Sequence, residues 1–163
     1  MFIVAPCNDS ILTKSHHCPI IMIEKHKKSI IYIIGGSLLN VTQEEVANYL
    51  EEVQAAVKEG RYQISPRQKN RELYFDYVFH EGDEKEILLS LKTDDFSEAV
   101  QNDHPQHPEE ILYIFGKDVS LMPRFGQGIE TVSLYIKFNK LANQYVIVIS
   151  LHKQEYPLKY QFK

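Results

Sequence analysis

The amino-acid sequence predicts an α+β domain in which N-terminal helices pack on one face of a C-terminal antiparallel β-sheet. Apolar residues recur at helical spacing between residues 42 and 91, where the runs begin at capping residues. Residues 131–153 instead alternate as strands do and form the clearest β-hairpin. A chain of 163 residues can bury one sizeable core but is short for two. We therefore expect one domain over residues 42–163, after an N-terminal extension of uncertain order over residues 1–41.

Two consecutive helices are expected from their end signals. Thr42 and Glu45 form a capping box, and the helix that they begin should stop at the next glycine. A second helix should begin after Ser65 as its N-cap, with Pro66 in the first helical position, and should end near residue 82. These helices supply the layer that should cover the sheet.

Shorter elements are expected between these helices and the hairpin. Asp83 with Glu86 repeats the capping box at the start of a third helix, and Thr93 is expected to cap a further helical turn over DDFSEAV. Residues 102–110 contain two prolines and are expected to form a loop. A strand should follow at residues 111–115 and end at the next glycine.

The hairpin places a group of polar side chains on one face. In the predicted register Asn139 lies opposite Gln144 and Ile136 lies opposite Ile147. This register gathers one apolar face, which should pack against the helices: Val132, Leu134, Ile136, Phe138, Tyr145, Ile147, Ile149 and Leu151. The other face, hereafter the open face, carries Ser133, Tyr135, Lys137, Ser150 and His152. These groups suit phosphate chemistry, although an ordinary solvated surface would have the same composition.

Charge is distributed unevenly along the chain. The formal net charge of −4 gives no general attraction to nucleic acid. Residues 121–163, however, hold six Lys and Arg against two Glu, a net of +4, whereas residues 81–118 hold eleven acids against three Lys, a net of −8. The basic residues expected to contact an RNA backbone are Arg67, Lys69, Arg71, Arg124 and Lys153. A solvated surface is again the alternative.

Metal, cofactor and membrane binding find little support in the sequence. Cys7 and Cys18 are the only cysteines, no CxxC pair is present, and His104 with His107 is a weak pair for metal or catalysis. No glycine-rich phosphate loop indicates a nucleotide cofactor. The apolar run at residues 30–41 is too short to span a bilayer. We expect no metal, no cofactor, no membrane contact, and a cytoplasmic protein with reduced thiols.

Four segments carry a recognisable combined pattern: the leading helix VANYLEEVQAAVKEGRY, the segment ILLSLKTDDF, the strand LYIKF and the strand VIVISLHK. Together, over about residues 46–153, they resemble the MqsR group of bacterial toxins, within the RelE-like ribonuclease superfamily. The resemblance implies a RelE-like fold and an endoribonuclease toxin, an mRNA interferase that cuts messenger RNA, free or on the ribosome. It also implies a cognate antitoxin protein as partner, and no direct binding of DNA.

The resemblance further implies roles for three residues of the open face. Tyr135 and Lys137 fall on the tyrosine and lysine of the family's Y-x-K strand, and His152 falls where the family places a catalytic basic residue. In metal-independent cleavage the adjacent 2′-OH attacks phosphorus, so His152 would be general acid or base and Lys137 would stabilise the phosphorane. Tyr135 would stack or orient a base, or assist proton transfer. In the predicted register Tyr135 and His152 are not directly opposite, so RNA would have to bridge them.

A second hypothesis keeps the fold and removes the chemistry. Glu98 lies near the place where the family can carry a lysine, and the total charge is acidic. On this hypothesis the chain is a catalytically incomplete RelE-like domain that binds a protein or RNA. Loss of RNA cleavage in a His152→Ala protein would separate the two hypotheses.

Overall fold

The computed structural model describes residues 38–163, so nearly all of the expected N-terminal extension lies outside the described residues. Within them, the helices are α1 (Gln43–Lys58), α2 (Gln68–Asp76) and α3 (Asp83–Leu89), and a 3₁₀ turn follows at Thr93–Asp95. The strands are β1 (Leu38–Leu39), β2 (Tyr62–Ile64), β3 (Tyr77–Val78), β4 (Phe96–Gln101), β5 (Ile111–Pro123), β6 (Glu130–Lys140) and β7 (Val146–Lys153). None of the described helices is long and apolar enough to cross a membrane.

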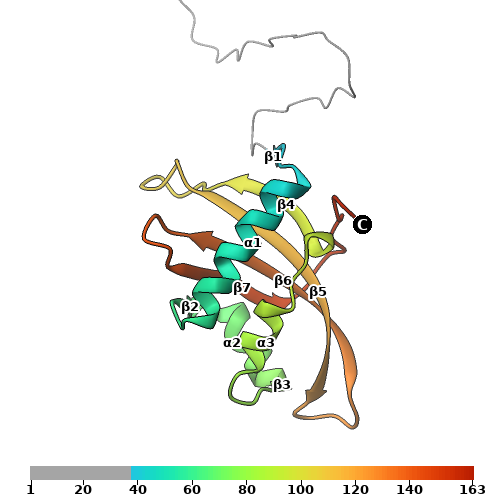
Figure 1. Cartoon of the computed structure of the whole chain (residues 1–163). Coiled ribbons are helices and arrows are strands. Elements are labelled where there is room, and N and C mark those ends of the chain that lie inside the picture. The colour runs from blue at the N-terminus through green and yellow to red at the C-terminus, as the bar shows by residue number, and fades with distance from the viewer. Residues whose placement is uncertain (1–37) are drawn as a thin grey trace, which may run out of the picture. The chain divides into compact units, whose positions relative to one another are not determined.

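The strands form one curled sheet, and the longest of them lie after the helices in the chain (Figure 1). The order across the sheet is β1-β4-β5-β6-β7-β2, and β3 pairs with β5 off this path. The predicted α+β class is confirmed. The neighbouring strands are antiparallel except β2 and β7, which run parallel. The sheet is therefore mixed, and the prediction of an antiparallel sheet is wrong for β2.

The first helix forms as its capping signals predict. Thr42 Oγ1 accepts a hydrogen bond from Glu45 N at 3.2 Å, and Glu45 Oε2 accepts one from Thr42 N at 2.7 Å. Gly60 follows the helix in the left-handed region at φ 75°, where glycine is favoured. In Figure 1 α1 lies across the sheet. The residues that it buries are Val46, Tyr49, Leu50, Val53, Ala56 and Val57.

The core lies between the helices and one face of the sheet. The fully buried strand residues of this core include Phe96, Phe115, Leu134, Ile136, Phe138, Val146, Val148 and Leu151. Phe115 meets Phe96 and Phe138 edge to face, with ring centroids 5.5 and 5.7 Å apart. Tyr113 of β5 stacks on Tyr49 of α1 with centroids 3.7 Å apart. Because Val132, Leu134, Ile136 and Phe138 of β6 are buried here, the alternating residues Ser133, Tyr135 and Lys137 lie on the open face.

The second helix is shorter than predicted at both ends. Arg67 is its N-cap, so the prediction that Ser65 caps it is wrong. The chain stays extended to that point because β2 pairs with β7, and Ser65 N continues the ladder by donating to Val148 O at 2.9 Å. The helix ends at Asp76 because β3 pairs with the end of β5. Both strands are too short to give a periodic signal.

Two further expectations between residues 83 and 101 are wrong. Gly82, at φ 93°, is the N-cap of α3, and Asp83 Oδ2 accepts a hydrogen bond from His80 N at 2.6 Å instead of forming the expected capping box. Within the segment DDFSEAV only Asp94 and Asp95 lie in a helical turn, the 3₁₀ turn Thr93–Asp95, whose N-cap is Lys92 rather than the expected Thr93. The rest of the segment forms β4, which pairs with both β1 and β5. A bulge between Phe96 and Glu98 interrupts the alternation that would have marked this strand.

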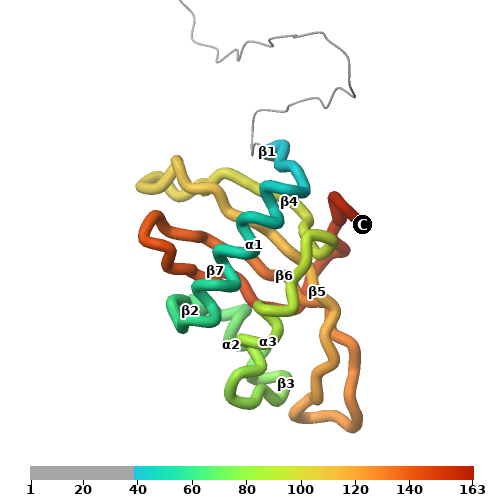
Figure 2. The backbone as a smooth tube through the Cα atoms, in the orientation of Figure 1, coloured from blue at the N-terminus to red at the C-terminus, as the bar shows by residue number. Residues whose placement is uncertain are grey.

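The strand β5 continues through Gly116, which was expected to end it, and Gly116 pairs with Tyr135 of β6. A Cβ atom at Gly116 would lie 2.5 Å from the Tyr160 hydroxyl oxygen and 2.8 Å from Leu158 Cδ1. The glycine therefore lets the C-terminal residues cross the open face at close range. Figure 2 shows this end of the chain returning towards β4 and β5. Before β5, residues 102–110 form the predicted loop.

Candidate active site

The β6–β7 hairpin forms, but its predicted register is wrong. Asn139 lies opposite Ile147 rather than Gln144. Towards the middle of β7 the register shifts by one residue, and Ile149 is an extra residue without a partner on β6. The core therefore receives Val146 and Val148 in place of the predicted Tyr145, Ile147 and Ile149, whereas Leu151 is buried as predicted. Both alternating sets of β7 are apolar up to residue 149, so hydrophobicity could not choose between them.

This bulge brings the two aromatic side chains of the open face together. Tyr135 and His152 are direct cross-strand partners, and their rings stack with centroids 5.2 Å apart and planes 19° apart. Lys137 and Ser150 form the neighbouring pair on the same face. RNA does not have to bridge Tyr135 and His152, as the predicted register required.

A pocket of about 420 Å³ lies over these two pairs, a size typical of small-molecule sites. Its floor is formed by Tyr135, Lys137, Ser150 and His152. The start of α2 lines it with Arg67, Lys69 and Asn70. Its remaining lining residues belong to the C-terminal segment: Glu155, Tyr156, Pro157 and Leu158. The structure thus brings five of the predicted site residues into one pocket: Tyr135, Lys137, His152, Arg67 and Lys69.

The C-terminal segment, residues 154–162 and hereafter the C-terminal strap, is attached near both of its ends. Near one end Glu155 Oε1 lies 2.6 Å from Lys69 Nζ, and this hydrogen-bonded ion pair lowers the pKa of the Glu155 carboxyl. Near the other end Gln161 N donates to Phe96 O at 3.1 Å, and Phe162 stacks on the Phe96 ring. An exposed ion pair of this kind contributes little stability, so a phosphate could replace Glu155 at Lys69.

Burial shifts the pKa values of both polar residues at the centre of the floor. It lowers the pKa of the Lys137 ammonium, Arg67 adds to this effect, and the carboxylates of Asp103 and Glu98 oppose it. Burial also raises the pKa of the Tyr135 phenol, with a further contribution from Glu98. The phenol therefore keeps its proton over a wide pH range.

The titration of Lys137 gives a test of this environment. By ¹³C NMR of its ε-carbon, Lys137 should titrate below the ordinary lysine pKa of about 10.4. Arg67→Gln should raise this pKa by removing a neighbouring cation, and Glu98→Gln should lower it further. In the alkaline window between the folded and unfolded pKa values the unfolded chain binds more protons, so the free energy of unfolding should rise with pH relative to Lys137→Gln. An unshifted Lys137 would contradict burial as the cause.

Comparisons with known proteins assign no family to this chain. No protein-family model matches it, and no curated protein sequence matches it. Because one fold class hosts many activities, the function has to be inferred from the pocket itself.

Three predicted RNA contacts do not line this pocket. Arg124 lies in the turn between β5 and β6, where its Nε donates to Tyr74 O at 2.9 Å and its backbone N donates to Asp76 O at 2.8 Å. Lys153 follows His152 on β7 and places its Nζ 3.5 Å from the Tyr77 hydroxyl oxygen. Arg71 is exposed on α2. Arg124 therefore stabilises the turn. The Lys and Arg residues that line the pocket are Lys137, Arg67 and Lys69.

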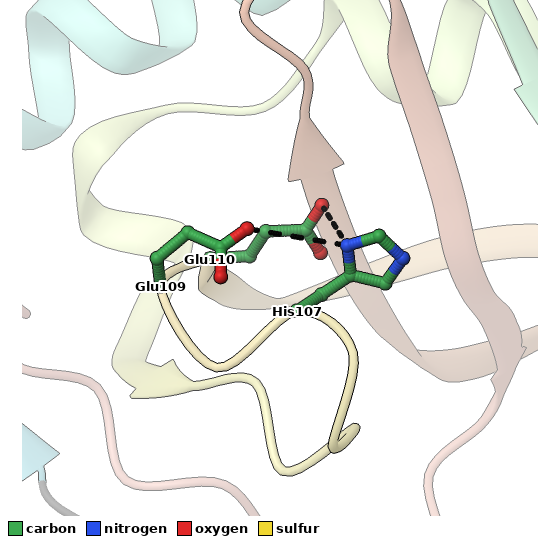
Figure 3. Close-up of side chains that lie close together, drawn as sticks. All are labelled: His107, Glu109 and Glu110. Carbon is green, nitrogen blue, oxygen red and sulfur yellow. Dashed lines mark ion pairs between the residues drawn. The ribbon is translucent and has the colours of Figure 1, made fainter.

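The loop before β5 holds a second group of titratable side chains, His107, Glu109 and Glu110 (Figure 3). Of the described residues, these three lie close enough together to hold a metal ion. His107 Nδ1 lies 4.0 Å from Glu109 Oε1 and 3.7 Å from Glu110 Oε1. The other Glu110 oxygen accepts hydrogen bonds from Asn102 and Asn139 at 2.8 and 2.7 Å. These ion pairs and hydrogen bonds account for the arrangement.

Sequence reasoning missed two residues that shape the pocket, Asn70 and Glu155. Asn70 is a polar residue of α2 that is buried against β7, and its local sequence shows no signal for this contact. The aromatic residues Tyr160 and Phe162 near the C-terminus were a usable signal for a packed strap, but not for its path across Gly116.

Proposed function

We propose that this chain is an endoribonuclease toxin with a RelE-like fold. It cleaves messenger RNA at the open face, in the cytoplasm, and is neutralised by a cognate antitoxin protein. The observation that carries the proposal is the stacking of Tyr135 on His152, with Lys137 beside them in one pocket. An aromatic surface, a group that transfers protons and a cation are what cleavage by a neighbouring 2′-OH requires.

In the proposed reaction the 2′-oxygen forms a bond to phosphorus, and the bond from phosphorus to the 5′-oxygen breaks. His152 accepts the proton of the 2′-OH. Tyr135 donates a proton to the leaving 5′-oxygen, which is consistent with the raised pKa that keeps its phenol neutral. Lys137 stabilises the negative charge of the phosphorane. The products are a 2′,3′-cyclic phosphate and a 5′-hydroxyl, and neither proton transfer requires a metal ion.

Single-stranded RNA fits this pocket better than a duplex. The pocket lies between the start of α2 and the C-terminal strap, which the Lys69–Glu155 ion pair connects. A base can reach the Tyr135–His152 rings once it is unstacked from its neighbours, as bases in loops and single strands are. Arg67 and Lys69 then lie where they can contact adjacent phosphates.

Induced expression in bacteria tests the proposal. The wild-type chain should arrest growth and produce discrete RNA ends in primer extension, and His152→Ala and Tyr135→Phe should relieve both effects. His80→Ala is the matched control, because the His80 side chain is 80% exposed and lies outside the pocket. Normal growth with intact RNA, at good soluble expression of the wild type, would refute the proposal. Equal toxicity of all variants would be consistent with a toxin but would reject His152 and Tyr135 as its catalytic residues.

The alternative, a RelE-like binding module without catalysis, is favoured by one observation. The carboxylates of Glu98 and Asp103 act on the charge of Lys137, and they would oppose a phosphate there. On this alternative the wild-type chain binds RNA or a protein and leaves RNA intact. A gel-shift assay with short RNA, run beside the cleavage assay, distinguishes binding from cutting.

A further inference from the structure

The bulge in β7 decides which of its side chains reach the open face. Val146 and Val148 face the core before the bulge, and Leu151 faces it afterwards. Without the extra residue, the alternation from Val148 would turn His152 towards the core and Lys153 towards the open face. The position of the imidazole therefore depends on this bulge.

One buried side chain forms hydrogen bonds with the backbone of the bulge, on the side of β7 away from β6. Asn70 of α2 is 1% exposed. Its Oδ1 accepts a hydrogen bond from Leu151 N at 2.9 Å, and its Nδ2 donates to Ile149 O at 3.2 Å and to Ser65 O at 2.8 Å. The carboxamide thus holds the backbone on both sides of Ser150.

Beyond the end of β2, the Asn70 carboxamide supplies the hydrogen-bond partners of the β7 backbone. The ladder between β2 and β7 ends with the bond from Ser65 N to Val148 O. Beyond it, Ile149 O and Leu151 N need partners, because a buried backbone group without one is costly. An amide presents the same donor and acceptor as a peptide group, whereas an ionised carboxylate has no donor and an alkyl group has neither.

We propose that Asn70 is a positioning residue whose carboxamide holds the β7 bulge and thereby sets His152 against Tyr135 on the open face. This structural role stands apart from the RNA chemistry, and its effect on cleavage rests on the proposed function. Asn70 acts through the backbone of residues 149–151.

NMR on the full chain tests the structural role. In the wild type, nuclear Overhauser contacts should join the Tyr135 and His152 rings, and the Leu151 amide should exchange slowly. Asn70→Ala should remove the ring contacts and accelerate Leu151 exchange roughly tenfold to a hundredfold, as expected when a buried amide loses its partner. Asn70→Asp keeps an acceptor for Leu151 but loses the donated bonds, so it should weaken the ring contacts with a smaller rise in exchange. If Asn70→Ala does not fold, Asn70→Asp carries the test.

Asn139 provides the matched control. It is also a buried asparagine of the sheet, 6% exposed, and it donates to Glu110 rather than to β7. Asn139→Ala should leave the Tyr135–His152 contacts and Leu151 exchange at wild-type values. Wild-type ring contacts in the folded Asn70 variants would overturn the proposal, and so would an equal loss of these contacts in Asn139→Ala.

Cleavage kinetics then separate this role from the proposed function. The Asn70 variants should lose kcat with KM close to the wild type, because Arg67 and Lys137 remain to bind phosphate. An unchanged kcat despite lost ring contacts would overturn the positioning role in catalysis. If the wild type leaves RNA intact while the ring contacts still depend on Asn70, the proposed function fails and the structural role of Asn70 stands.

Discussion

Purified His152→Ala protein is expected to cleave RNA about 10²–10⁴-fold more slowly than the wild type, the usual contribution of one general acid or base. Its imidazole stacks on Tyr135 and lines the pocket, so its removal takes away the proposed proton acceptor for the 2′-OH. Single-turnover rates on a short RNA measure the loss. His80→Ala should cut at the wild-type rate, since His80 lies outside the pocket.

Variants of the stacking partner sharpen this result. Tyr135→Phe keeps the ring that stacks on His152 and removes the phenol, the proposed proton donor, so it should slow cleavage while RNA affinity is kept. Tyr135→Ala removes both and should also weaken binding. Full activity in His152→Ala would contradict the proposal that His152 is the general base. Full activity in Tyr135→Phe would show that Tyr135 acts by stacking and not as a proton donor.

Phe96→Ala is expected to lower the free energy of unfolding by about 3–5 kcal/mol, as large aromatic truncations in cores do. Phe96 is fully buried, meets Phe115 in the core and receives Phe162 of the C-terminal strap. The substitution therefore leaves a cavity and removes a support of the strap. Urea denaturation followed by circular dichroism measures the change.

Phe125→Ala is the matched control for this prediction. Phe125 is 80% exposed in the turn between β5 and β6, so its loss should change stability by no more than about 0.5 kcal/mol. Comparable losses in the two variants would contradict the assignment of the core to the side of the sheet that α1 covers.

The sequence predicts the elements whose signals are local. The capping box at Thr42 and Glu45 needs only residues three apart, and it forms. The alternation of Val132, Leu134, Ile136 and Phe138 in β6 is unbroken, and all four residues are buried. The same alternation predicts that Tyr135 and Lys137 lie on the opposite face, and they line the pocket.

What the sequence does not reveal depends on contacts distant along the chain. Residues 145–149 are apolar on both faces, so the register of β7 is decided by the bulge and by Asn70 rather than by hydrophobicity. The short strands β2 and β3 exist only through their pairing with β7 and β5. The strap follows a path that the missing side chain of Gly116 permits, which no local pattern indicates.

The chemical identity of the RNA ends tests the central claim most directly. The wild-type chain would be incubated with a defined single-stranded RNA in EDTA, beside the same RNA carrying 2′-deoxy sugars at the cleaved positions, and the products read by mass spectrometry. We predict a 2′,3′-cyclic phosphate and a 5′-hydroxyl from the RNA, and no cleavage at the deoxy positions. Intact RNA, or ends carrying a 3′-hydroxyl and a 5′-phosphate, would contradict cleavage through the 2′-OH at the open face.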